Sequence, residues 1–135
     1  MGREILFRGK RIDNEEWVEG DLLREKDVFG EICTRIFQIK GNGMFRKNDI
    51  DPETVCQYTG LIDKNGRKIF EGDVVRYERK LFAVRWADGI ASFSAKPLEE
   101  CRCIPCTNDG TMKISEVIGN IFDNLELLQK GNFGG

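Results

Sequence analysis

The 135-residue sequence contains no histidine, and this absence excludes several kinds of chemistry at once. Histidine is the usual acid–base group near neutral pH, the usual partner of serine and cysteine nucleophiles, and the commonest metal ligand. The chain also lacks a phosphate-binding Gly-Lys-Ser/Thr loop, and its scarce serines have no plausible base. Adjacent carboxylates such as Glu15 and Glu16 would point to opposite faces of a strand, so they cannot form an acid–base pair. The sequence therefore predicts a protein that is not an enzyme and needs no cofactor.

Long apolar stretches and a surplus of basic residues are missing too. No stretch approaches the roughly 18 residues that cross a bilayer, and the N-terminal residues lack the apolar core of a signal peptide. The five cysteines are odd in number, which favours reduced thiols. The net charge is −2, so the protein does not have the strongly basic surface that binds phosphate groups non-specifically. We expect a cytoplasmic protein with no membrane partner.

What the sequence does contain is a series of short strands separated by turns. Residues 30–40 alternate between two faces, and the turn signals at 63–66 and 87–89 each separate two strand-like segments. Residues 48–52 read as a polar loop. This pattern predicts a mostly β fold with a minor α+β character, in which residues 55–122 form an SH3-like barrel or meander.

The predicted organisation is an N-terminal β subdomain over residues 1–50 and a C-terminal subdomain over residues 51–135, together forming one compact domain. The chain ends in a short helix, for which Asp123 is the expected cap. Its apolar stripe consists of Leu125, Leu127 and Leu128, and Gly131 is expected to stop it.

A weak internal repeat links the two halves. The segment 17–24 aligns with 69–76, and each contains two large apolar residues followed by Glu-Gly-Asp and a strand. Upstream, Ile12-Asp13 parallels Ile62-Asp63. One interpretation makes each Glu-Gly-Asp a bend that opens a strand, with glycine relieving the backbone. The alternative is a cation site built from Glu19, Asp21, Glu71 and Asp73. We favour the bend, because residues so close in sequence supply too few oxygen ligands.

The same residues resemble a known family. The segment 58–75, YTGLIDKNGRKIFEGDVV, is similar to the central signature of the YopX-like proteins of phages and prophages. The opening residues 3–8 and the closing residues 117–128 resemble the two ends of that family, although Leu125 stands where a proline is expected. The resemblance implies a phage or prophage product with a mostly β fold and no established activity.

Three cysteines form the most suggestive local cluster, and they have no counterpart in the family pattern. Cys101, Cys103 and Cys106 lie in a turn-rich segment and offer thiolates for zinc, with Cys33 or Cys56 as a fourth ligand. The alternative is that these cysteines are small packing residues. We favour packing, because structural zinc sites more often contain two separated Cys-x-x-Cys pairs.

A second candidate site lies on the strands of the predicted barrel. Arg76, Lys80, Arg85 and Trp86 combine cations with an aromatic ring, a combination that binds single-stranded nucleic acid. The aromatic residues of these strands are also what a small barrel needs for its core. We favour the core interpretation, in which Phe82, Val84 and Trp86 face inward and Ala83 and Arg85 face solvent. The interpretation we favour is a non-catalytic interaction or assembly module that forms a homo-oligomer. The alternatives are a nucleic-acid-binding accessory factor and a zinc-stabilised binding domain.

Overall fold

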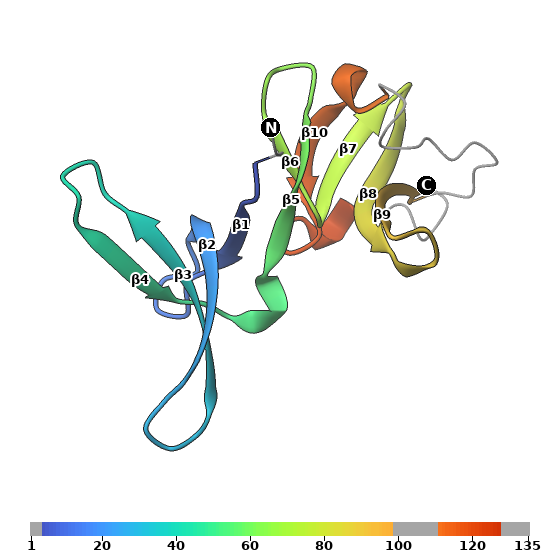
Figure 1. Ribbon diagram of the computed structural model, residues 1–135. Helices are drawn as coiled ribbons and strands as arrows, with labels where there is room; N and C mark the ends of the chain where they lie inside the picture. Colours follow the sequence, from blue (N-terminus) through green and yellow to red (C-terminus); the bar gives the residue numbers. More distant parts are fainter. Residues whose placement is uncertain (1–3, 99–110, 128–135) are drawn as a thin grey trace. The chain divides into compact units, whose positions relative to one another are not determined.

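The computed structural model describes residues 4–98 and 111–127, and the chain divides into two compact units, Met1–Tyr58 and Thr59–Gly135. Strands make up most of both units (Figure 1). The elements in chain order are β1 (Phe7–Lys10), β2 (Trp17–Lys26), β3 (Ile32–Ile39), β4 (Phe45–Asp49), the 3₁₀ turn η1 (Pro52–Thr54), β5 (Cys56–Ile62), β6 (Lys68–Phe70), β7 (Asp73–Tyr77), β8 (Lys80–Ala87), η2 (Asp88–Ile90), β9 (Ser92–Pro97), η3 (Thr111–Ile114) and β10 (Glu116–Asn120).

The N-terminal unit is an antiparallel sheet in which β4, β3, β2 and β1 lie in that order. The start of β5 then pairs with β1. Arg11, directly after β1, forms an isolated bridge with Ile50, directly after β4. Two backbone hydrogen bonds support this bridge: the Ile12 amide donates to the Asp49 carbonyl at 3.0 Å, and the Asp51 amide to the Lys10 carbonyl at 2.9 Å.

The core of the N-terminal unit is small. Ile36 on β3 and Ile50 are almost completely buried, and Asn48 lies buried beside them. The Asn48 side-chain amide donates to the Ile36 carbonyl and to the Gln38 side chain, both at 3.1 Å. The prediction that residues 48–52 form a polar loop was therefore wrong, because Asn48 and Asp49 end a strand and Ile50 belongs to the core.

The C-terminal unit contains the hairpin β5–β6 and a four-stranded antiparallel sheet. The turn predicted at residues 63–66 joins β5 to β6, and its Gly66 has φ +82°. In the sheet the order is β10, β7, β8 and β9. One face of this sheet packs into a core made of Ile69, Val75, Phe82, Val84, Ala95 and Val117.

The mostly β prediction is confirmed, and the segment β7–β8–β9 is the predicted meander. The sheet is not a closed barrel among the described residues, since β9 and β10 are its two edges. The strands β7 and β8 are joined through Glu78 and Arg79, which both have positive φ. A two-residue turn of this kind normally carries asparagine or glycine, and Glu78 and Arg79 are neither, so no local pattern predicts it.

The C-terminal helix is described only at its start, residues 125–127. The residue directly before it is Asn124 rather than the predicted cap Asp123. The Asn124 side chain accepts a hydrogen bond from the Asn120 amide at 3.0 Å, so it closes the preceding turn. Leu128 and Gly131 lie outside the described residues. No helix among those residues is long and apolar enough to cross a membrane.

Candidate functional site

The four residues predicted to bind nucleic acid lie on β7 and β8, but on opposite faces of the sheet. Side chains alternate along a strand, and the register pairs Arg76 with Leu81 and Tyr77 with Lys80. Arg76 and Arg85 therefore share one face, while Lys80 and Trp86 share the other. The Trp86 ring packs edge-on against Phe93 at the end of the core face, with 5.1 Å between the ring centroids. Within each pair the residues are also separated along the strands, since Trp86 is six residues from Lys80 and Arg85 is four positions from Leu81, the register partner of Arg76. The structure therefore does not bring the four residues together.

Arg76 has a partner on the neighbouring strand. Its guanidinium donates to Glu116 on β10 at 2.9 Å, and Lys64 lies 3.5 Å from the same carboxylate. The hydrogen bond from Arg76 is the main reason that the pKa of Glu116 lies below its usual value. Arg76 is thus part of an ion-pair network with Glu116 and Lys64 on the surface of the C-terminal unit.

The candidate zinc ligands Cys101, Cys103 and Cys106 lie outside the described residues, so the zinc site stays a prediction. Cys33 and Cys56, the suggested fourth ligands, both lie in the N-terminal unit, and neither forms a disulfide with a described residue. Within residues 4–98 and 111–127, no three acidic or cysteine side chains are grouped so that they could hold a metal ion. The cation site considered for the Glu-Gly-Asp carboxylates is therefore not present among these residues either; those carboxylates are Glu19, Asp21, Glu71 and Asp73.

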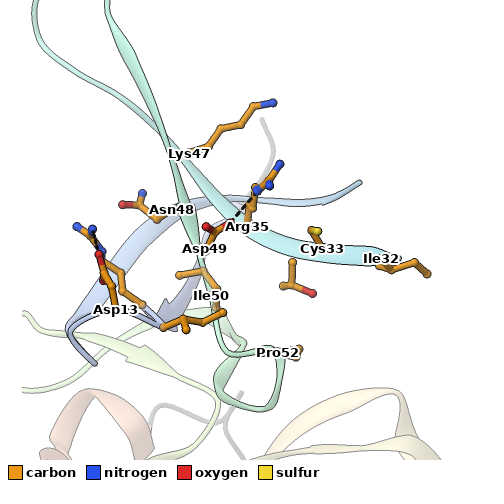
Figure 2. A pocket seen from close by; sticks show the side chains of 12 residues that line it. Asp13, Ile32, Cys33, Arg35, Lys47, Asn48, Asp49, Ile50 and Pro52 are labelled. Carbon is orange, nitrogen blue, oxygen red and sulfur yellow. Dashed lines mark hydrogen bonds and ion pairs between the residues drawn. The ribbon is translucent and has the colours of Figure 1, made fainter. Parts of the chain in front are cut away.

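A pocket that the sequence did not indicate lies in the N-terminal unit (Figure 2). Its volume is about 520 Å³, within the roughly 300–1,000 Å³ typical of ligand pockets. The lining comes from the segment after β1, from β3, and from β4 with the residues that follow it. Apolar lining is provided by Ile12, Ile32, Ile50 and Pro52. Ile50 is 1% exposed, whereas Ile12 and Ile32 are 64% and 57% exposed, so the apolar lining extends from the core to the surface.

The charged residues of the pocket all take part in ion pairs. Arg11 forms two hydrogen bonds with Asp13, at 2.6 and 3.0 Å. Arg35 on β3 donates to Asp49 on β4 at 2.9 Å and to Glu25 on β2 at 3.0 Å. Figure 2 shows the Arg35–Asp49 pair within the lining. The pocket therefore presents ion pairs of both signs beside an apolar surface.

These ion pairs move the pKa values of Asp13 and Arg35 away from neutral pH. The hydrogen bond from Arg11 lowers the pKa of Asp13, and the hydrogen bond to Asp49 raises the pKa of Arg35. A general acid or base needs the opposite shift, toward the working pH. The arrangement fits the binding of a ligand with apolar and polar parts better than it fits proton transfer.

Sequence reasoning missed this pocket because its parts are far apart in the sequence. Ile12, Ile32 and Ile50 come together only through the sheet register and the Arg11–Ile50 bridge. No local pattern marks them, and the sequence predicts a polar loop over residues 48–52, where Ile50 lies.

Comparison with known proteins places the chain in a family. The sequence pattern of the YopX protein family matches residues 6–129, which includes most of both units. The chain belongs to the YopX family. A solved structure of protein EF1440 from Enterococcus faecalis is similar to this YopX-family protein, with 28% sequence identity and a TM-score of 0.60. The likeness covers 94% of this chain and 99% of that chain. No curated protein matches it.

Proposed function

We propose that this YopX-family protein is a non-catalytic, cytoplasmic assembly module of phage or prophage origin, and that its copies associate through the N-terminal unit. The observation that carries the proposal is the loop between β2 and β3. Its Val28 and Phe29 are 93% and 85% exposed, more than any other large apolar side chain in the described residues. A protein that exposes such side chains on a well-formed loop gains by covering them.

The loop is held in one conformation by Asp27. The Asp27 carboxylate accepts hydrogen bonds from the amides of Phe29 at 2.8 Å and Glu31 at 2.9 Å. The Asp27 amide donates to the Glu31 carbonyl at 2.8 Å, and the Gly30 amide to the Asp27 carbonyl at 3.0 Å. Because the loop is already ordered, little conformational entropy is lost when it binds.

The pocket of a second copy is a suitable receptor for this loop. Its apolar lining matches the phenyl ring of Phe29, and its ion pairs match the polar flanks of the loop, Asp27 and Glu31. Ring burial in an apolar pocket with a polar rim is the usual arrangement at an interface centre. Because each copy carries both the loop and the pocket, two copies can exchange loops around a two-fold axis.

Size-exclusion chromatography with light scattering tests the proposal, using the full chain at 5–100 μM. We expect a discrete oligomer for the wild type. Phe29→Ser removes the ring from the loop and Ile12→Ser removes an exposed part of the pocket lining, and each is expected to shift the protein toward monomer. Ile90→Ser is the matched control, because Ile90 is 69% exposed and belongs to the C-terminal unit.

A wild-type monomer at 100 μM would refute self-association. An oligomer that persists in both Phe29→Ser and Ile12→Ser would refute the proposed contact. Circular dichroism of each variant confirms that it is folded, as expected for substitutions at exposed positions.

A further inference from the structure

The hairpin formed by β3 and β4 has a charge distribution unlike that of the rest of the chain. Residues 32–48, here called the basic hairpin, contain four cationic side chains and no aspartate or glutamate, in a protein whose net charge is −2. These cations are Arg35, Lys40, Arg46 and Lys47. The whole-chain charge hides this local excess, which favours a polyanionic partner.

Two of the four cations are available for such a partner. Arg35 is engaged by Glu25 and Asp49, and Lys47 by Glu25 at 2.8 Å. Lys40 and Arg46 form no ion pair with any described residue. Both lie near the end of the hairpin where β3 turns into β4.

Exposed apolar side chains lie at the same end. Phe45 is 63% exposed, Met44 66% and Ile39 71%. The Phe45 ring stacks on Phe37 with 5.1 Å between the centroids and 29° between the planes. Phe37 pairs with Lys47 and Ile39 with Phe45 in the register, so these four side chains share one face of the hairpin.

The loop of the basic hairpin is ordered and polar. The Lys40 amide donates to the Met44 carbonyl at 2.6 Å, and the Met44 amide to the Asn42 side chain at 3.1 Å. Insertion of this end into a lipid surface would bury the polar residues Gly41-Asn42-Gly43 before any ring. The ring of Phe45 is instead presented on a strand, with Lys47 on the same face and Lys40 in the adjoining loop, and proteins that stack single-stranded bases combine rings and cations in this way.

We infer that the basic hairpin binds single-stranded nucleic acid. A base stacks on the exposed side of the Phe45 ring, and Lys40 in the adjoining loop contacts a flanking phosphate. Arg46 alternates with Phe45 and lies on the other face, so it contacts a phosphate where the nucleic acid passes around the edge strand β4. Strand β4 is at the edge of the N-terminal sheet, so a flexible single strand reaches this face more readily than a duplex does. The inference is independent of the assembly proposal, because it uses a different end of β3 (Figure 1).

Fluorescence anisotropy with a labelled 15-nucleotide oligothymidine measures this binding in a buffer of about 25 mM salt. Phe45→Ala is expected to weaken it about tenfold, through the loss of one stacked base. The double variant Lys40→Gln/Arg46→Gln is expected to lower the slope of log K against log salt by about 1.4, since each phosphate contact on a single strand contributes about 0.7. The matched controls are Ile90→Ala for the exposed apolar residue and Lys96→Gln/Lys113→Gln for the charges, all in the C-terminal unit.

Three outcomes would overturn the inference. The first is no measurable binding at 100 μM protein. The second is an equal loss of affinity in the basic-hairpin variants and in the controls. The third is binding to vesicles containing phosphatidylserine without binding to oligothymidine, which would point to a membrane surface. Phe29→Ser, the variant that tests assembly, is titrated in parallel, so a failure of assembly and a failure of nucleic-acid binding are read separately.

Discussion

The two Glu-Gly-Asp segments contain the same three residues and have different structures. In the N-terminal unit the triplet lies inside β2, whose ten residues run without a break from Trp17 to Lys26. In the C-terminal unit Gly72 occupies a turn with φ +88°, and Asp73 is the first residue of β7. The bend predicted for both copies is thus present only in the second.

The glycine and the aspartate of the triplet have different roles in the two units. Gly20 is required because a Cβ atom there would overlap the carbonyl oxygen of Phe37 on the neighbouring strand. Gly72 is required by its positive φ. Asp21 is exposed, whereas Asp73 is 2% exposed and accepts a hydrogen bond from the Phe70 amide at 2.8 Å.

The aspartates upstream of the triplets differ in the same way. Asp13 pairs with Arg11 at the surface. Asp63 is 3% exposed and accepts hydrogen bonds from the amides of Asn65, Arg67 and Val117 at 2.8–2.9 Å. A similar pattern of residue types therefore stabilises the backbone of the C-terminal unit and faces solvent in the N-terminal one.

The largest difference is expected between Asp63→Ala and Asp13→Ala. Removal of the Asp63 carboxylate leaves three amides without their acceptor, including that of the buried Val117, and should cost about 2–3 kcal/mol of unfolding free energy. Asp13→Ala removes only an exposed ion pair and should change stability little. Urea unfolding measures both. Trp86 fluorescence in a Trp17→Phe background follows the C-terminal unit for Asp63→Ala, and Trp17 fluorescence in a Trp86→Phe background follows the N-terminal unit for Asp13→Ala. Equal losses of unfolding free energy would show that the two aspartates contribute equally to stability, against this prediction.

Asp73→Ala compared with Asp21→Ala is the next test. Loss of the buried acceptor for Phe70 should destabilise the protein by about 1–3 kcal/mol, whereas the exposed Asp21 should matter by less than about 0.5 kcal/mol. The same urea titration applies, and Asp73→Asn is a useful control because its amide oxygen still accepts one hydrogen bond. If Asp21→Ala lowered the unfolding free energy as much as Asp73→Ala, the difference in burial between the two aspartates would not determine their contributions to stability.

The two glycines should respond differently to asparagine. Gly72→Ala forces a side chain into positive φ and should cost about 1–2 kcal/mol. Gly72→Asn should recover part of that loss, because asparagine tolerates this conformation. Gly20→Asn should be no better than Gly20→Ala, since any Cβ meets the Phe37 carbonyl. Thermal unfolding of the four variants decides the matter, and rescue by asparagine at Gly20 would contradict the steric explanation.

The smallest expected effect is the pH dependence of the Asp63 contribution. Burial alone would raise the pKa of Asp63, but the three backbone amides outweigh it and hold that pKa below its usual value. A carboxylate with a lowered pKa stabilises the fold fully above its unfolded pKa of about 3.9, and this contribution is lost as the pH falls through the folded pKa. The difference in stability between the wild type and Asp63→Asn should therefore be constant from pH 7 to about pH 5 and should shrink below about pH 4. A difference that stays constant to pH 2.5 would argue against a charged Asp63.

Much of the C-terminal unit was predictable because its signals are local. The Asp63–Gly66 turn needs a residue that tolerates positive φ, and Asn65-Gly66 supplies it. In the strand 81–86, Phe82 and Val84 are buried as the alternation indicates. The same pattern was wrong for the other two positions, because Ala83 is also buried and Trp86 is 45% exposed. Less was predictable where special residues are absent, as at Glu78 and Arg79, whose positive φ is imposed by the strands on either side.

By itself, the sequence determined the mostly β fold, the main turns and the YopX family, since these depend on residue types close together in the chain. The tertiary structure decided how each repeated residue is used. Gly20 is required because the carbonyl of Phe37 on the neighbouring strand leaves no room for a Cβ atom. The apolar part of the pocket forms because Ile12, Ile32 and Ile50 come together from separate segments. Contacts of this kind depend on sheet register, and a register shift of one residue reverses every face.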